Sequence, residues 1–179
     1  MHARLILSAI ALCTALDPTA AADPVKAGDP FPAVELKAVN ADQVPGKKAG
    51  DKLSITDFQG KTVVVFFYPK ALTSGCTTES CGFRDLAGKF PKDAVLVGAS
   101  ADGMELQQKF ADAHKLPYPL LCDPDLKLID ALGVRAAGKK MAKRVTVVVG
   151  KDGKVSKVYD TVSPKDHPAD VLKYVEALK

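Results

Sequence analysis

The sequence lacks tryptophan and contains few aromatic residues and few cysteines, and each shortage argues against a class of protein. Aromatic residues make up 6% of the 179 positions and lysines are scattered, so no base-stacking platform or dense phosphate-binding stripe is present, and we expect no nucleic-acid partner. Four cysteines are too few for a small disulfide-built scaffold. A net charge of only +4 and a hydrophobic share of 47% are ordinary for a globular domain.

The first 22 residues have the composition of a secretory signal peptide. A basic start over residues 1–4 precedes an apolar run over residues 5–16, and the alanines at 20–22 form a small-residue cleavage pattern. This run is shorter than the roughly 20 residues that a membrane-spanning helix needs, and a buried N-terminal helix is the weaker alternative. We therefore expect cleavage after Ala22, a periplasmic or secreted protein without stable membrane insertion, and one monomeric domain over residues 23–179.

Alternating apolar runs and amphipathic segments predict an α/β fold. Strands are predicted over residues 34–36, 53–55, 61–68, 94–99, 119–122, 144–149 and 155–159, and an exposed loop over 40–52. Helices are predicted over residues 76–90, 104–114, 125–132 and 168–178. The β-branched run within residues 61–68 is typical of a strand buried on both faces. This order predicts a thioredoxin-like three-layer α/β/α sandwich with a mixed central sheet.

Cys76 lies at the predicted start of a helix, directly after the buried strand. Unpaired backbone N–H groups and the helix dipole favour an anion at such a position, so a thiolate is stabilised there. The same N–H groups and the hydroxyl of Thr73, three residues upstream, can bind the oxygens of a small oxidised substrate. Thr73 is alternatively only the residue that caps the helix, and the two roles are compatible.

Cys81 follows Cys76 by five residues. On one continuous helix the two residues are about 7.5 Å apart along the axis, with azimuths that differ by about 140°. Because a disulfide needs Cα atoms within roughly 7 Å, a bridge requires the first helical turns to unwind. The spacing favours a redox pair that changes conformation over a fixed bridge, and two unrelated buried thiols remain the alternative.

Arg144 is predicted to open a buried strand. A charged side chain is costly there unless it pairs with an anion. The carboxylate of Glu79 or the thiolate of Cys76 would supply that partner.

The region around Cys76 resembles the peroxiredoxin family. Pro69-x-x-x-Thr73-x-x-Cys76 matches the peroxidatic-site pattern, and residues 75–85, with Gly75, Cys76, Glu79 and Cys81 at the matching positions, resemble the Q-type branch, also called bacterioferritin comigratory protein. The resemblance extends over essentially the whole chain after residue 22. It departs from the common Q-type pattern at three positions, which are Ala71, Ser74 and Cys122.

The resemblance implies a role for each matching residue. Cys76 would be the peroxidatic cysteine and Cys81 the resolving cysteine. The substrate pocket would be completed by Pro69, Thr73, Gly75 and Arg144, and Glu79 would hold the arginine. The thiolate of Cys76 would attack a hydroperoxide to give a sulfenic acid, and condensation with Cys81 would give an intramolecular disulfide. A thioredoxin-like dithiol would then reduce this disulfide, and no cofactor is needed.

Two other functions fit the cysteines less well. A thiol–disulfide oxidoreductase would have a Cys-x-x-Cys motif, which is absent. A metal-binding or copper-delivery module would use Cys76, Cys81 and one of His2, His114 or His167, but the spacing matches no compact ligand set, and we expect no metal.

Three further residues are predicted to have no catalytic role. His114 and His167 are predicted to be solvated helix or loop residues. Cys122 follows two leucines and is predicted to be a small buried hydrophobic residue, not a reactive thiol.

Overall fold

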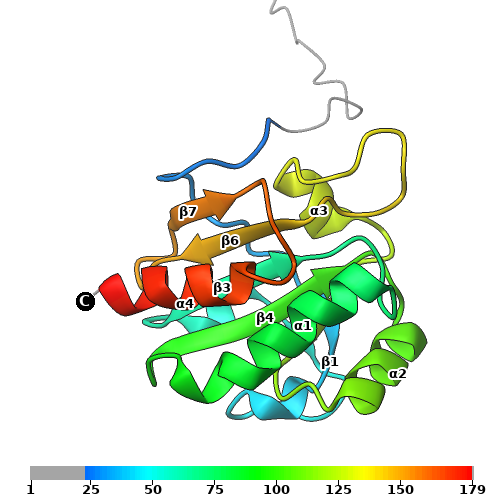
Figure 1. Cartoon of the computed structure of the whole chain (residues 1–179). Coiled ribbons are helices and arrows are strands. Elements are labelled where there is room, and N and C mark those ends of the chain that lie inside the picture. Colours follow the sequence, from blue (N-terminus) through cyan, green and yellow to red (C-terminus); the bar gives the residue numbers. More distant parts are fainter. Residues whose placement is uncertain (1–22, 179) are drawn as a thin grey trace, which may run out of the picture.

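The computed structural model describes residues 23–178, so the predicted signal peptide lies outside the described residues (Figure 1). Within this range the strands form one mixed sheet in the order β2-β1-β5-β4-β3-β6-β7. The strands are β1 (Leu36–Val39), β2 (Lys52–Leu53), β3 (Thr62–Phe67), β4 (Ala94–Ser100), β5 (Leu120–Cys122), β6 (Val145–Val149) and β7 (Val155–Tyr159).

The centre of the sheet is β3, and all six of its residues are buried. It pairs in parallel with β4 and antiparallel with β6. Phe67, the last residue of β3, lies opposite Ala99 of β4 and Val145 of β6. The chain therefore leaves β3 at the edge where Ser100 ends β4 and where Arg144 leads into β6, and this edge carries the site described below.

Helices cover one face of the sheet and shorter elements cover the other. The first layer contains α1 (Ser74–Leu86), α2 (Met104–His114) and α4 (His167–Ala177), which lie together in front of the sheet in Figure 1. Their core includes Phe83, Phe110 and Val171. The opposite core contains Leu128 and Ile129 of α3 (Lys127–Ala131), together with residues of the N-terminal segment. This arrangement confirms the predicted three-layer α/β/α sandwich with a mixed sheet. No helix among residues 23–178 is long and apolar enough to cross a membrane.

The prediction was wrong at several element ends in the N-terminal third. The first strand occupies Leu36–Val39 instead of residues 34–36, because this segment pairs with both β2 and β5. The strand predicted over residues 53–55 ends at Leu53, and a 3₁₀ helix, η2 (Ile55–Phe58), follows it. The reason is a capping box in which Asp57 accepts a hydrogen bond from the backbone N–H of Ser54 at 2.8 Å.

The predicted loop over residues 40–52 is also not wholly exposed. It contains the 3₁₀ helix η1 (Ala41–Gln43), and the side chains of Ala41 and Val44 are buried in the core.

Helix boundaries were also shifted by backbone conformation and capping. The helix predicted over residues 76–90 begins at Ser74 and ends at Leu86, where the 3₁₀ helix η3 (Ala87–Lys89) replaces its last turn. The helix predicted over 125–132 is reduced to Lys127–Ala131, since Leu126 has a left-handed backbone. Asp123 stabilises its start by accepting hydrogen bonds from three successive N–H groups, those of residues 127–129.

Candidate active site

A short turn connects the end of β3 to the start of α1 and presents Cys76. Pro69 lies half-buried two residues after β3 ends, and α1 begins at Ser74. Cys76 is therefore the third residue of α1, and its side chain is 1% exposed. The first i to i−4 bond of the helix runs from the N–H of Thr77 to the carbonyl of Thr73, at 2.8 Å. The N–H groups of the three residues before Thr77 have no intrahelical acceptor and form an anion-binding helix start.

Thr73 occupies the N-cap position of α1, but its side chain makes no capping hydrogen bond. Its hydroxyl instead donates to the carbonyl oxygen of Lys70 at 2.8 Å. Thr73 is thus the N-cap residue by position, as the alternative predicted, but its side chain does not cap the helix. Since the hydroxyl hydrogen is used within the turn, the oxygen of this exposed residue is left to act as a hydrogen-bond acceptor.

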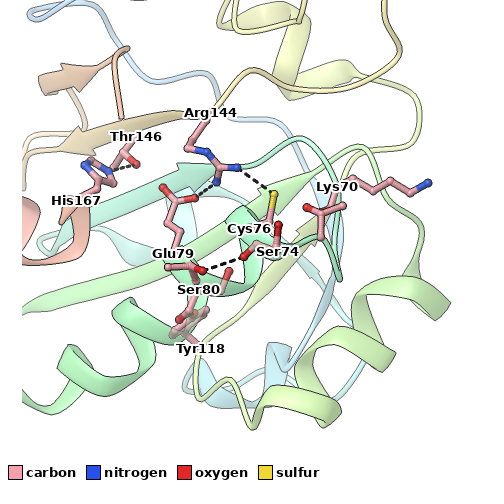
Figure 2. Close-up of polar contacts among 11 residues, drawn as sticks. Lys70, Ser74, Cys76, Glu79, Ser80, Tyr118, Arg144, Thr146 and His167 are labelled. Carbon is pink, nitrogen blue, oxygen red and sulfur yellow. Dashed lines mark hydrogen bonds and ion pairs between the residues drawn. The ribbon is translucent and has the colours of Figure 1, made fainter. Parts of the chain in front are cut away.

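Arg144 links the site together from the position directly before β6, which begins at Val145 and not at the predicted residue 144. One end of its guanidinium, Nη2, donates to the sulfur of Cys76 at 3.3 Å, and Nη1 donates to Oε2 of Glu79 at 2.5 Å (Figure 2). A Cβ atom at Gly75 would lie 3.2 Å from Nη2. Glycine at this position therefore leaves the room that the guanidinium needs to reach the sulfur.

Glu79 lies three residues after Cys76 on α1 and is fully buried. Its Oε1 atom accepts no hydrogen bond from residues 23–178, while Oε2 pairs with Arg144. Burial raises the pKa of this carboxyl to about 7, although the positive charge of Arg144 acts in the opposite direction. The single guanidinium thus contacts both the Glu79 carboxyl and the Cys76 sulfur.

Cys81 lies farther along the same uninterrupted helix and is partly exposed. Both Cys76 and Cys81 are free thiols, as the helical spacing predicts. The segment between and after them is tied to its surroundings, because the hydroxyl of Tyr118 donates to the carbonyl of Ser80 at 2.7 Å and Gly82 packs against Pro168 of α4. These contacts hold the middle of α1, so a bridge between the two sulfurs requires the first turns of the helix, which carry Cys76, to unwind.

Cys122 is separate from this pair. It lies on β5, which is two strands away from β3, and its thiol donates to the sulfur of Met104 at 3.4 Å. Burial raises the pKa of the Cys122 thiol to about 12. The predicted burial of Cys122 is confirmed, and its lack of reactivity stays a prediction.

The prediction that His167 is solvated is wrong. Its side chain is buried at the start of α4, Nε2 lies 2.8 Å from the hydroxyl oxygen of Thr146, and its ring packs edge-on against Phe83 and Tyr159. The cause is the close packing of α4 on α1 and on the sheet. Burial, aided by the charge of Arg144, lowers the pKa of His167 to about 4. Among residues 23–178, no three His, Cys, Asp or Glu side chains are grouped so as to hold a metal ion.

One contact of the active-site turn did not follow from the sequence. The carboxylate of Asp102 accepts a hydrogen bond from the backbone N–H of Ala71 at 2.7 Å, between Pro69 and Thr73. The sequence position of Asp102 could have indicated this contact, because Asp102 follows the end of β4 and β4 is the parallel neighbour of β3. Residues that follow neighbouring parallel strands meet at one edge of a sheet.

Known proteins share this sequence pattern and this fold. The model of the AhpC/TSA family matches residues 27–158. Peroxiredoxin Bcp of Bacillus subtilis is 40% identical over 131 residues, which cover 69% of this chain and 83% of the relative.

Two solved structures are also similar. Peroxidoxin BcpB of Mycobacterium tuberculosis has a TM-score of 0.74 and 35% identity, covering 86% of this chain and 98% of that chain. The bacterioferritin comigratory protein of Xanthomonas campestris, described for its alkyl peroxide reduction activity, has a TM-score of 0.71 and 26% identity, covering 80% and 90% of the two chains.

Proposed function

The chain belongs to the AhpC/TSA family and is a peroxiredoxin of the Bcp type, a thiol-dependent peroxidase, and we propose that Cys76 is the residue that attacks the hydroperoxide. The observation that carries this assignment is the contact of 3.3 Å between the sulfur of Cys76 and Nη2 of Arg144. The guanidinium of Arg144 beside the sulfur and the start of α1 beneath it place positive electrostatic potential at the reacting atom.

The peroxide binds between the α1 start and Arg144 in this proposal. The hydroxyl oxygen of Thr73 accepts a hydrogen bond from the peroxide O–H, because its own hydrogen is donated to Lys70. The free N–H groups at the start of α1 and the guanidinium of Arg144 bind the peroxide oxygens. Pro69 lines the turn and limits access of water to the sulfur.

The chemical step is a two-electron oxidation of sulfur. The Cys76 thiolate attacks the distal oxygen, so that an S–O bond forms, the O–O bond breaks and a sulfenic acid is produced. The leaving oxygen takes up one proton and departs as water or an alcohol, and this proton balances the one released when the thiol ionised. Arg144 and the helix N–H groups stabilise the negative charge that develops on the leaving oxygen.

Resolution follows by disulfide formation with Cys81. Because α1 is continuous through both cysteines, its first turns unwind before the Cys81 thiol condenses with the sulfenic acid and releases water. A dithiol of thioredoxin type then reduces the disulfide by exchange and restores both thiols. Sulfur carries the whole redox change, and no cofactor enters the cycle. Alkyl hydroperoxides are included among the substrates on the basis of the activity described for the Xanthomonas campestris relative.

Steady-state turnover tests this function. The purified, reduced protein is mixed with a thioredoxin-type dithiol, and consumption of hydrogen peroxide and of an alkyl hydroperoxide is followed. The wild type and a Cys122→Ser control should consume both peroxides, and Cys76→Ser should consume neither. Peroxide turnover by Cys76→Ser at the wild-type rate would contradict the assignment.

The site of action is a separate proposal that rests on the first 22 residues. A basic start, an apolar run and an Ala20 to Ala22 cleavage pattern support export to the periplasm or the medium. We separately propose that residues 23–179 act as a monomer. Expression of the full chain followed by N-terminal sequencing tests the processing. An exported protein that begins at Asp23 is expected, whereas an uncleaved chain that stays in the cytoplasm would overturn the proposal. Size-exclusion chromatography of the processed form tests the monomer.

A further inference from the structure

The active-site turn is tied to the body of the protein by one side chain from a different element. Oδ2 of Asp102 accepts hydrogen bonds from the backbone N–H of Ala71 at 2.7 Å and from the hydroxyl of Ser100 at 2.9 Å. Asp102 lies between β4 and α2, so this contact crosses 31 positions of sequence. A carboxylate that accepts from an amide and a hydroxyl forms charge-assisted hydrogen bonds, which are stronger than neutral ones.

The anchor continues into the core as a chain of buried polar groups. The side-chain amide of Gln107 on α2 donates to the hydroxyl oxygen of Ser100 at 2.9 Å. Its carbonyl oxygen accepts from the hydroxyl of Tyr68 at 2.5 Å. All three of these side chains are fully buried. Ser100 is thereby fixed by two partners, and it holds Asp102 in the position that Ala71 requires.

The turn needs such an anchor because part of its backbone is strained. Leu72, next to Ala71, has φ of +62° and is 46% exposed. A left-handed backbone is unfavourable for a non-glycine residue and persists only where neighbouring contacts enforce it. On one side of Leu72, Ala71 is buried and bound to Asp102, and on the other side Thr73 bonds back to Lys70.

We propose that Asp102 is a positioning residue that holds the peroxide-binding turn in its folded form and thereby acts in opposite directions on the two halves of the catalytic cycle. This inference rests on the proposed function of Cys76 and Cys81. The peroxide step requires the intact turn, since the turn places Thr73 and the start of α1 around the substrate. The resolving step requires the same turn and the first turns of α1 to open.

The hydrogen bond from Ala71 to Asp102 therefore favours the first step and opposes the second. When the carboxylate is removed, the N–H of Ala71 loses its acceptor and the strain at Leu72 is released by opening of the turn. The population of the folded turn falls, so the peroxide reaction slows. The population of the opened turn rises, so the disulfide forms faster. A residue with only a general structural role would not shift the two rates in opposite directions.

Quenched-flow mixing with hydrogen peroxide measures both rates in one experiment. The chain has no tryptophan, so oxidation cannot be followed by tryptophan fluorescence. Samples are instead quenched with acid and analysed by mass spectrometry, which separates the thiol, sulfenic acid and disulfide forms. In Asp102→Ala the sulfenic acid should form about tenfold more slowly, as expected for a misplaced binding group. The disulfide should then form about tenfold faster, as expected for loss of a charge-assisted hydrogen bond in the folded turn.

Two further variants complete the test. Asp102→Asn keeps an acceptor oxygen of lower charge, so it should show the same opposite shifts at smaller size, including in the case that Asp102→Ala does not fold. Asp51→Ala removes a carboxylate that accepts a backbone N–H, from Lys48 at 2.8 Å, in a different loop, and it should leave both rates unchanged.

The inference is overturned if the wild type forms the sulfenic acid and the disulfide but the Asp102 variants leave both rates unchanged or lower both together. Failure of the wild type to oxidise at Cys76 would instead overturn the proposed function and this inference with it.

Discussion

The guanidinium of Arg144 lies 3.3 Å from the sulfur of Cys76, although 68 positions separate the two residues in the sequence. The antiparallel pairing of β6 with β3 produces this contact, because Phe67 lies opposite Val145 and the chain turns toward α1 just beyond. The second end of the guanidinium is held by the buried carboxyl of Glu79. Arg144 is therefore held in place by the Glu79 carboxyl while its other end contacts the sulfur of Cys76.

Removal of Arg144 should damage the chemistry more than the fold. In Arg144→Ala we expect the reaction of Cys76 with peroxide to slow about 100-fold, the usual effect of losing a donor that stabilises developing negative charge. The rate is measured by rapid mixing. The free energy of unfolding is measured in urea below pH 7, where the Glu79 carboxyl retains its proton. Removal of Arg144 then leaves no buried negative charge without a partner, so the stability should change little. An unchanged peroxide rate would remove Arg144 from the catalytic account.

A methyl group at Gly75 should displace the guanidinium without changing any charge. In Gly75→Ala the new Cβ lies 3.2 Å from Nη2 of Arg144, so the arginine shifts away from the sulfur and the peroxide reaction slows about tenfold. Gly88→Ala is the matched control, because a Cβ atom at Gly88 would have no neighbour within 4 Å. Equal peroxide rates for the two variants would show that the close approach at Gly75 has no role in catalysis.

The ionisation of Glu79 should make the wild type less stable as the pH rises. Its pKa in the folded protein is raised from 4.5 to about 7, so its contribution is fully favourable below pH 4.5 and is lost as the pH rises through 7. The loss is at most on the order of 3 kcal/mol. Glu79→Gln has no carboxyl to ionise. As the pH rises from 4.5 to above 7, the unfolding free energy of Glu79→Gln should therefore increase relative to that of the wild type. A constant difference between the two proteins would contradict the assigned pKa.

His167 should act in the opposite direction. Its pKa is lowered from 6.5 to about 4, so the stability that it contributes is present above pH 6.5 and is lost as the pH falls through 4. His167→Gln keeps a partner for Thr146 and cannot become charged. Between neutral pH and acid, its unfolding free energy in urea should therefore fall less than that of the wild type. His114→Gln, at the partly exposed end of α2, is the control and should lose as much stability in acid as the wild type does. Equal acid sensitivity of His167→Gln and the wild type would contradict the buried, neutral state of the histidine.

Much of the fold was predictable because its periodicity is local. The β-branched run of β3 and the amphipathic pattern of α2 identify these elements from neighbouring residues alone, and α2 was predicted with its observed boundaries. The ends of other elements depend on contacts that local patterns do not contain. The left-handed backbone at Leu126 and the capping box between Ser54 and Asp57 are examples.

The site was predictable to the extent that its residues belong to one motif. Cys76, Thr73 and Glu79 lie within a short segment, and a charged residue entering a buried strand singled out Arg144. The anchoring of Ala71 by Asp102 and the pairing of His167 with Thr146 were not predicted. Each joins residues at least 21 positions apart, and only the packing of the sheet and helices brings them together.

The most direct test follows single-turnover oxidation of the reduced wild type and of Cys81→Ser by hydrogen peroxide, with the modified residues mapped by mass spectrometry. We expect Cys76 to be oxidised first in both proteins, the wild type to proceed to a disulfide between Cys76 and Cys81, and Cys81→Ser to accumulate the sulfenic acid after one equivalent of peroxide. Normal cycling of Cys81→Ser through a bridge between Cys76 and Cys122 would contradict the resolving role of Cys81. A Cys76 thiol that remains unmodified while peroxide is consumed would contradict its role as the attacking nucleophile.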